Sequence, residues 1–307
     1  MNVRSDAAVV VEARGLAKTF RDFWRRPRVA AVDGLSLTVR AGEVSGLLGP
    51  NGSGKSTTLK MLLGLLFPTR GELKVFGQSP HLSAVKARLG YMPEESYLYR
   101  YLTAAEALDF YGRLFDLDAA TRRERVDQLI EMAGLRDAAH RRIGEFSKGM
   151  ARRVELAQAL INDPDLIILD EPTSGLDPLG CRQVKDLIRA LAGRGKTIIL
   201  ASHLLADVED VCSRVTILHQ GRVQAEGPVD ELLQDRRSVR LTLQALPPER
   251  LKSVLDAVAR ETGAVPSVDH PQQTLEDYFL RVIAQAAKSP ETDSARLAPY
   301  LSPDPET

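Results

Sequence analysis

The chain of 307 residues is long enough for one large α/β domain and a smaller appendage. Its 41 basic and 41 acidic side chains give no net charge, which excludes a general electrostatic attraction to nucleic acid or anionic lipid. The longest apolar runs, Met61–Phe67 and Leu166–Leu169, fall far short of the roughly 20 residues that span a bilayer, so in any membrane process another chain must supply the span.

Short apolar and alternating segments predict the strands of a sheet. The stretch 8–13 is rich in valine, and residues 35–40 alternate apolar and polar side chains, as half-buried strands do. Continuous apolar runs at 44–48, 166–169 and 197–201 are typical of strands that are buried on both faces. Helical segments are expected at 55–66, 103–115, 149–161, 178–192 and 204–213. This alternation predicts an α/β fold with a mostly parallel sheet and a small antiparallel element near the start.

The last third of the chain predicts a smaller domain and a tail. Gly221 and Gly227 bracket one more short strand, and a helix follows at 229–235. Residues 237–286 are expected to form a small α+β accessory domain. Its expected elements are an alternating strand at 238–243, a helix that starts at Pro247-Pro248, and a helix through Leu275, Tyr278, Phe279 and Val282. Prolines and polar residues over 287–307 predict a disordered tail.

A glycine-rich loop follows the apolar run at 44–48. Residues 49–56 match the pattern G-x-x-x-x-G-K-[ST] and precede a helical segment, which is the context of a phosphate-binding loop. Its glycines let the backbone amides point at a triphosphate, and the helix adds the positive end of its dipole. A glycine-rich turn that happens to precede a lysine would not need this flanking strand and helix. The expected ATP-binding residues are Gly49, Asn51, Gly52, Ser53, Gly54, Lys55, Ser56 and Thr57.

Acidic residues and a histidine follow two other predicted strands. Asp170 and Glu171 end the apolar run at 166–169, where the carboxyl edge of a parallel sheet forms the ligand crevice. Asp170 is expected to ligate Mg²⁺, and Glu171 to act as the base that polarises the attacking water. His203 is expected to hydrogen-bond the γ-phosphate. The alternatives are two acids that cap a strand and a histidine of purely structural role.

The order of the motifs resembles one family of ATPases. Phe146-Ser147-Lys148-Gly149-Met150 precedes a helix and resembles the ABC signature motif. Residues 170–178 are similar to that family's Walker B segment running into its D-loop, and His203 matches its switch histidine. The resemblance covers about residues 8–230. It implies an ABC ATP-binding domain over 8–236, with a P-loop NTPase sheet, a small antiparallel β subdomain, a helical subdomain and the C-terminal appendage.

The resemblance also implies a dimer. In this family each ATP lies between the phosphate loop of one subunit and the signature of the other, so Ser147, Gly149 and Asp177 are expected at the nucleotide. Lys148 stands where glycine is usual and adds positive charge beside the phosphate, and Met150 stands where glutamine is usual.

Two further positions match functional residues of the family. Phe20 matches an aromatic residue that stacks on adenine, although a structural phenylalanine is the alternative. Glu94 stands where the family's Q-loop has glutamine, and its carboxylate can ligate Mg²⁺. The expected metal ligands are therefore Ser56, Asp170 and Glu94.

Two aromatic stretches suggest contacts with partners. Residues 20–28 mix arginine with aromatic side chains, which is compatible with a solvated hairpin, a partner or membrane contact, or nucleic acid. Residues 97–101, Tyr-Leu-Tyr-Arg-Tyr, lie where the family receives its membrane subunit, and a simple amphipathic loop is the alternative.

The resemblance implies an ATPase that powers transport from the cytoplasmic face of the membrane. Its expected partners are an integral-membrane permease and a second ABC ATPase domain, in a homodimer or a pseudo-dimer, and no nucleic acid is expected. Residues 91–102 and 274–279 look like the ATPases of ABC-2-type exporters, which favours export. The alternative is a soluble ABC ATPase that acts on nucleic acid or ribosomes, but the chain lacks the tandem domains and the long coiled coil of those classes. A GTPase is excluded because no Asn-Lys-x-Asp motif occurs.

Overall fold

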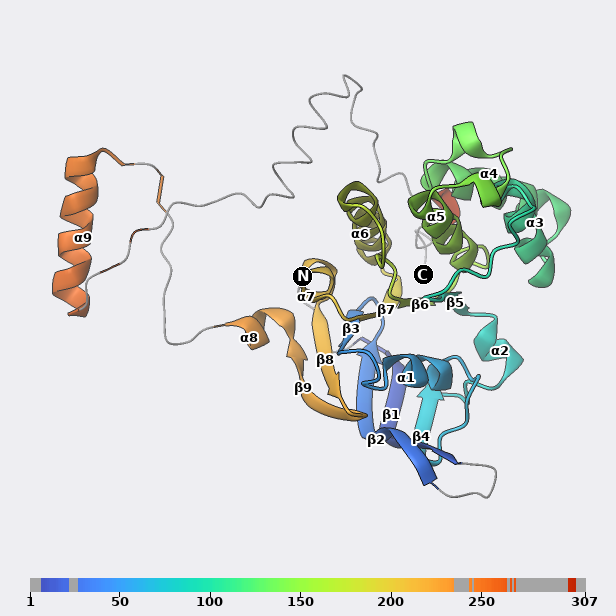
Figure 1. The fold of residues 1–307 in the computed structure, drawn as a ribbon, viewed down its shortest axis with the longest axis horizontal. Coiled ribbons are helices and arrows are strands. Elements are labelled where there is room, and N and C mark those ends of the chain that lie inside the picture. The colour runs from blue at the N-terminus through green and yellow to red at the C-terminus, as the bar shows by residue number, and fades with distance from the viewer. Residues whose placement is uncertain are drawn as a thin grey trace. The chain divides into compact units, whose positions relative to one another are not determined.

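The structure is a computed structural model that describes residues 7–21, 27–234, 243–244, 246–263, 266, 268 and 298–301. The chain divides into two compact units (Figure 1), the first made of Met1–Leu232 with Pro290–Thr307 and the second of Leu233–Ser289. In the second unit, helix α9 (Pro248–Thr262) begins at the Pro247-Pro248 pair as predicted. The helix predicted through Leu275 and nearly all of the strand predicted at 238–243 lie outside the described residues.

The first unit contains a six-stranded sheet in the order β5-β6-β7-β3-β8-β9, which is parallel except for its last strand. Every residue of the strands predicted at 44–48, 166–169 and 197–201 is buried, which confirms the prediction of covered strands. The strands are β3 (Val44–Leu48), β5 (Leu89–Met92), β6 (Leu166–Asp170), β7 (Thr197–Ser202), β8 (Arg214–His219) and β9 (Arg222–Pro228).

An antiparallel sheet lies on the other side of helix α1 (Lys55–Leu62), in the order β2-β1-β4. Its strands are β1 (Val9–Arg21), β2 (Pro27–Arg40) and β4 (Arg70–Val75). One apolar cluster joins Leu16 and Leu35 of this sheet to Leu59 of the helix and to Leu47 and Ile168 of the parallel sheet. The helix that carries the phosphate loop is therefore packed between two sheets.

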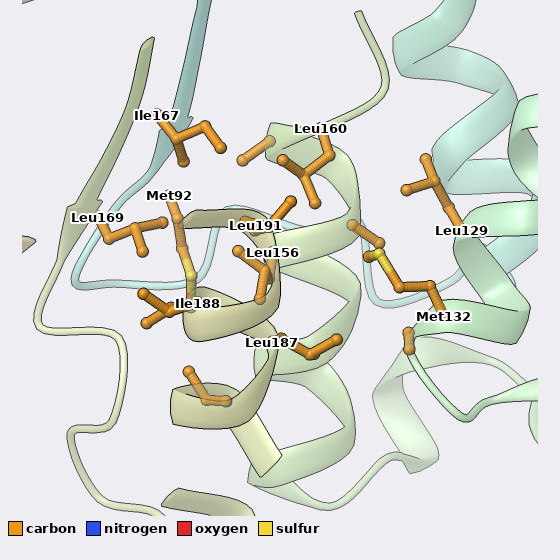
Figure 2. Close-up of a cluster of buried hydrophobic side chains, with 14 of the residues drawn as sticks. Met92, Leu129, Met132, Leu156, Leu160, Ile167, Leu169, Leu187, Ile188 and Leu191 are labelled. Atoms are coloured by element: carbon orange, nitrogen blue, oxygen red, sulfur yellow. The ribbon is translucent and has the colours of Figure 1, made fainter. Parts of the chain in front are cut away.

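Helices cover the opposite face of the parallel sheet. Figure 2 shows Leu156 and Leu160 with Leu187 and Leu191 against Met92 and Leu169 of the strands. Leu129 and Met132 continue the same cluster away from the sheet (Figure 2). The helices that contribute are α3 (Ala104–Leu114), α4 (Ala119–Met132), α5 (Lys148–Ala159) and α6 (Pro178–Gly193). Shorter helices are α2 (Ser83–Lys86), α7 (Leu205–Val211) and α8 (Val229–Leu233), and 3-10 turns span Arg136–Ala138 and Ile143–Glu145.

Side-chain caps fix where helices α3, α4, α5 and α6 begin, and Asp118 caps α4 by accepting hydrogen bonds from the Ala120 and Thr121 amides. Thr103 forms a capping box with Glu106 at the start of α3, and Ser147 accepts a hydrogen bond from the Met150 amide at the start of α5. Asp177 accepts one from the Gly180 amide at the start of α6. Two expected functional residues, Ser147 and Asp177, are therefore held at helix N-termini.

The predicted helix over 55–66 is too long. Helix α1 ends at Leu62 because Gly64 adopts the left-handed conformation, with φ of 64°. A Cβ at Gly64 would lie 2.2 Å from the carbonyl oxygen of Pro80, so no other residue fits there.

The prediction of a disordered tail over 287–307 is wrong for residues 298–301. Pro299–Leu301 form a 3-10 turn, and Ala298 and Leu301 are buried in the cluster of Figure 2. The Tyr300 hydroxyl donates to the Leu160 carbonyl at 3.1 Å, and Arg194 donates to the Ala298 carbonyl at 2.8 Å. We call residues 298–301 the clasp. Tertiary contacts stabilise the clasp, and its proline-rich local sequence gives no sign of them.

We expect Leu301→Ala to lower the free energy of unfolding by about 2 kcal/mol, because it removes a fully buried side chain from the clasp. Denaturant-induced unfolding measures this change. Leu114→Ala is the matched control, since Leu114 is 63% exposed and its loss should change stability by less than about 0.5 kcal/mol. Equal midpoints for Leu301→Ala and the unchanged protein would contradict the docking of the clasp.

Candidate nucleotide-binding site

The glycine-rich loop connects β3 to α1 and surrounds the amino group of Lys55. Gly54 precedes the helix with φ of 106°, and a Cβ there would lie 2.5 Å from the Ala31 carbonyl oxygen. Lys55 is 6% exposed, and its Nζ donates to the Gly49 carbonyl at 2.6 Å. Asn51 and Gly52 are exposed at the tip of the loop, whereas Ser56 and Thr57 are half-buried on the helix. The loop therefore brings a cation and a helix N-terminus close together, and this combination suits a triphosphate.

Three strand ends bring Lys55, Glu171 and His203 together. Glu171 follows β6, and its Oε1 lies 3.5 Å from Lys55 Nζ. Its Oε2 lies 2.8 Å from Nδ1 of His203, which follows β7. Glu171 is 3% exposed and has φ of 49°, a conformation that is uncommon for any residue except glycine. In this arrangement the carboxylate is held between an ammonium group and an imidazole beside the phosphate loop.

Asp170 fits a bound Mg²⁺. Its Oδ1 is buried and has no hydrogen-bond partner among the described residues. Burial, the largest cause, acts with the charges of Glu94 and Glu171 to raise the pKa of Asp170 to about 6, while a hydrogen bond from Ser56 and the charge of Lys55 oppose the shift. A cation beside Ser56 and Asp170 would offset the desolvation of this carboxylate.

The described residues contain no cluster of three or more His, Cys, Asp or Glu side chains that could hold a metal ion by themselves. This is compatible with Mg²⁺, which commonly takes one or two protein ligands and completes its shell with phosphate oxygens and water. Glu94 is exposed after β5, and its charge acts on Asp170. Ser56 and Glu94 thus both influence the carboxylate of Asp170.

The signature residues lie on a different element from the phosphate loop. Ser147 is exposed at the start of α5, and within the described part of the chain no hydrogen bond or ion pair joins residues 147–150 to residues 49–56. The Lys148 side chain lies over the D-loop of its own subunit, since a Cβ on Gly175 would be 1.9 Å from Lys148 Nζ. Ser147 and Lys148 are exposed and can contact another molecule, whereas Gly149 and Met150 are half-buried.

Phe20 lies near the end of β1 and is 41% exposed. The Lys18 ammonium group lies 5.5 Å from the centroid of its ring. The exposed ring can stack on a planar group such as a base. Residues 22–26, which carry most of the arginine-aromatic stretch, lie outside the described residues.

A surface pocket of about 440 Å³ lies beyond the strand β5, and we call it the tyrosine pocket. Its lining residues are Leu98, Tyr99, Arg100, Tyr101, Arg142, Gly144 and Glu145. Tyr101 is 85% exposed, and Tyr99 makes an edge-to-face contact with Phe110, with ring centroids 5.8 Å apart. Sequence reasoning identified the tyrosines but not Arg142 or Glu145, which come from a segment some forty residues later.

Sequence reasoning also missed Arg152, a buried arginine of α5 that contacts the backbone of Glu171. A signal was available, because Arg152 lies four residues before Leu156 and seven before Ala159 and so shares their buried helix face. A charged side chain on such a face requires specific partners.

Residues 32–174 match the protein family described as ABC transporter. An uncharacterised ABC transporter ATP-binding protein of Nostoc sp. is 40% identical, over 89% of this chain and 90% of its own length. The Nod factor export ATP-binding protein I of Burkholderia lata is 39% identical, over 82% of each chain.

Among solved structures, the dimeric structure of MJ0796, a bacterial ABC transporter cassette, has a TM-score of 0.66 and 26% identity. The similarity covers 71% of this chain and 98% of that one. A dimeric post-hydrolysis state of the same cassette, bound to ADP and phosphate, has a TM-score of 0.65. These similarities confirm the fold class predicted from the sequence.

Proposed function

Because this chain belongs to the ATP-binding proteins of ABC transporters and is therefore an ATPase, we propose that it dimerises around Mg²⁺ and ATP and powers export through a separate membrane subunit. The observation that carries the proposal is the cluster of Lys55, Glu171 and His203 beside the phosphate loop. It combines a phosphate-binding cation, a buried carboxylate base and a hydrogen-bonding imidazole within one site.

The three side chains explain how nucleotide binding starts the reaction. Glu171 lies 3.5 Å from the Lys55 ammonium group and 2.8 Å from the His203 imidazole. A γ-phosphate that takes Lys55 as its counter-ion leaves Glu171 to accept a proton from water, whose oxygen attacks the γ-phosphorus as the bond to ADP breaks. His203 orients the phosphate. Ser56, Asp170 and Glu94 would hold Mg²⁺, which neutralises charge on the phosphate oxygens when bound.

The second half of each site is supplied by another subunit. Ser147 and Gly149 stand at the N-terminus of α5, where a hydroxyl and backbone amides can bind a phosphate, and Lys148 adds positive charge beside them. Asp177 at the start of α6 lies close enough to the signature helix to act on the Arg153 charge. The dimeric structure of the related cassette supports this arrangement. Phe20 would stack on the adenine of the same nucleotide.

The tyrosine pocket is proposed as the contact with the membrane subunit. In the part of the chain that the structure describes, no helix has the length and apolar character of a membrane span. Exposed tyrosine and arginine side chains favour protein interfaces. Export follows from the relatives named for Nod factor export, and the chain would act at the cytoplasmic face of the membrane.

We expect Tyr101→Ala to reduce recovery of a co-expressed multi-span membrane subunit by roughly 10-fold, because large exposed aromatics at the centre of an interface carry much of its affinity. Co-purification measures the ratio of the two chains. Tyr97→Ala is the control, since Tyr97 is 70% exposed in the same segment but does not line the pocket. Equal recovery with both variants, or consistent recovery of the unchanged protein with ribosomes or DNA, would contradict this assignment.

A further inference from the structure

Arg152 is a buried arginine on the helix that begins with the signature motif. It is 3% exposed, and its guanidinium group makes three hydrogen bonds. NH1 donates to the Pro93 carbonyl at 2.8 Å and to Glu155 Oε2 at 2.7 Å. NH2 donates to the Glu171 carbonyl at 2.8 Å. One side chain of α5 therefore holds the backbone just before Glu94 and the backbone of the proposed catalytic base.

Stability alone does not account for this arrangement. Burying a guanidinium group and a carboxylate is unfavourable unless both are fully hydrogen-bonded. Arg152 Nε and Glu155 Oε1 are both buried, and neither has a hydrogen-bond partner among the described residues. An apolar pair of similar volume would avoid this desolvation, so the charge pair is better explained by what the guanidinium group holds in place.

The backbone of Glu171 needs such support. Its φ of 49° is unfavourable for a residue with a side chain and persists only where neighbouring groups fix it. The Glu171 amide donates to the Ala201 carbonyl of β7 at 2.9 Å. Its carbonyl accepts from Arg152 and from the Ser174 amide, the latter at 3.1 Å. The peptide units on both sides of the residue are thus fixed, which sets the direction in which the carboxylate leaves the backbone.

We propose that Arg152 is a positioning residue for hydrolysis, which holds the Glu171 backbone in the conformation that directs its carboxylate toward the attacking water. Through its bond to Pro93 it also ties the segment of Glu94 to the signature helix. The side chain thereby links the surface that meets a partner subunit to the base that acts on the phosphate of its own subunit. This inference rests on the proposed role of Glu171.

The test compares the double variant Arg152→Met/Glu155→Met with the unchanged protein. Removing both charges avoids leaving one of them buried and unpaired, so the variant is expected to fold with an unchanged melting temperature. We expect kcat for ATP hydrolysis to fall on the order of 10- to 100-fold, because a displacement of about 1 Å at a reacting group can have an effect of this size. The Kd for a fluorescent ATP analogue should change less than about 3-fold, since the phosphate loop is untouched.

Three further variants make the result decisive. Arg152→Lys keeps a charge and donors, and it should recover part of kcat, which a purely packing role would not produce. Arg125→Met is the control. Arg125 also donates to a backbone carbonyl, that of Ile161 at 2.8 Å, but neither Pro93 nor Glu171 is its partner in this hydrogen bond. In a Glu171→Gln background, the Arg152→Met/Glu155→Met pair should cause little further loss, as expected for residues that act through one another.

Wild-type kcat in Arg152→Met/Glu155→Met, together with a large loss in Glu171→Gln, would overturn the inference and leave the proposed function intact. Retained hydrolysis in Glu171→Gln would instead remove the base on which both depend. A fall in kcat matched by a similar loss of ATP affinity would also count against a positioning role, since it would indicate general damage to the site.

Discussion

Glu171→Gln is expected to lower the rate of ATP hydrolysis by about 10²- to 10⁴-fold, the range that a general base contributes. Glutamine has nearly the same shape and can keep the contact with His203, but it cannot accept a proton from water. In the unchanged protein the Glu171 charge competes with phosphate for Lys55, at 3.5 Å, so ATP affinity should be retained or increased. Single-turnover hydrolysis and equilibrium binding of ATP measure the two effects separately.

Glu209→Gln provides the matched control for this substitution. Glu209 is an exposed acid on α7, six residues after His203, and the loss of its charge should leave hydrolysis unchanged. Undiminished hydrolysis in Glu171→Gln would show that another group activates the water.

Lys55→Ala is expected to weaken ATP binding by roughly 100-fold or more, because a buried ammonium group that pairs with phosphate contributes several kcal/mol. The loss should be large here for a second reason. Without Lys55, the Glu171 carboxylate, which is 3% exposed, would face the triphosphate with no cation between them. Titration with a fluorescent ATP analogue measures the change in Kd.

The same helix offers the control for Lys55→Ala. Lys60 lies five residues later on α1 and is exposed, so Lys60→Ala removes an equal charge without touching the site. An ATP affinity that Lys55→Ala leaves unchanged would refute the assignment of residues 49–56 as the phosphate loop.

Sequence patterns predicted the parallel strands β3, β6 and β7 because their apolar character is continuous and local, but they did not predict the parallel strand β5. They missed helix α4, because its buried residues are few among many charged ones and no apolar stripe stands out; these buried residues are Val126, Leu129, Ile130 and Met132. They also missed strand β8, in which only half of the residues are buried, and the antiparallel strand β4, in which every residue except Val75 is exposed or half-buried. The clasp at 298–301 could not be predicted, because its order depends on contacts with residues more than 100 positions away.

The candidate site likewise has a part that the sequence could predict and a part that it could not. The meeting of Lys55, Glu171 and His203 could be anticipated, since each follows a strand of one parallel sheet and the carboxyl ends of such strands share an edge. The role of Arg152 could not, because its partners at Pro93 and Glu171 are distant in sequence and are backbone carbonyls, which carry no residue-specific signal. The contact of Lys148 with Gly175 depends likewise on how α5 packs against the D-loop.

Sedimentation of the Glu171→Gln protein with saturating ATP is the most direct test of a triphosphate held between two copies of the chain. A subunit mass of 33.7 kDa should double when ATP is added and return to its starting value when ATP is removed. Adding Ser147→Arg should prevent the change, because a bulky side chain would then stand where the phosphate meets the signature. A mass that stays at 33.7 kDa while ATP fills the site would contradict the account.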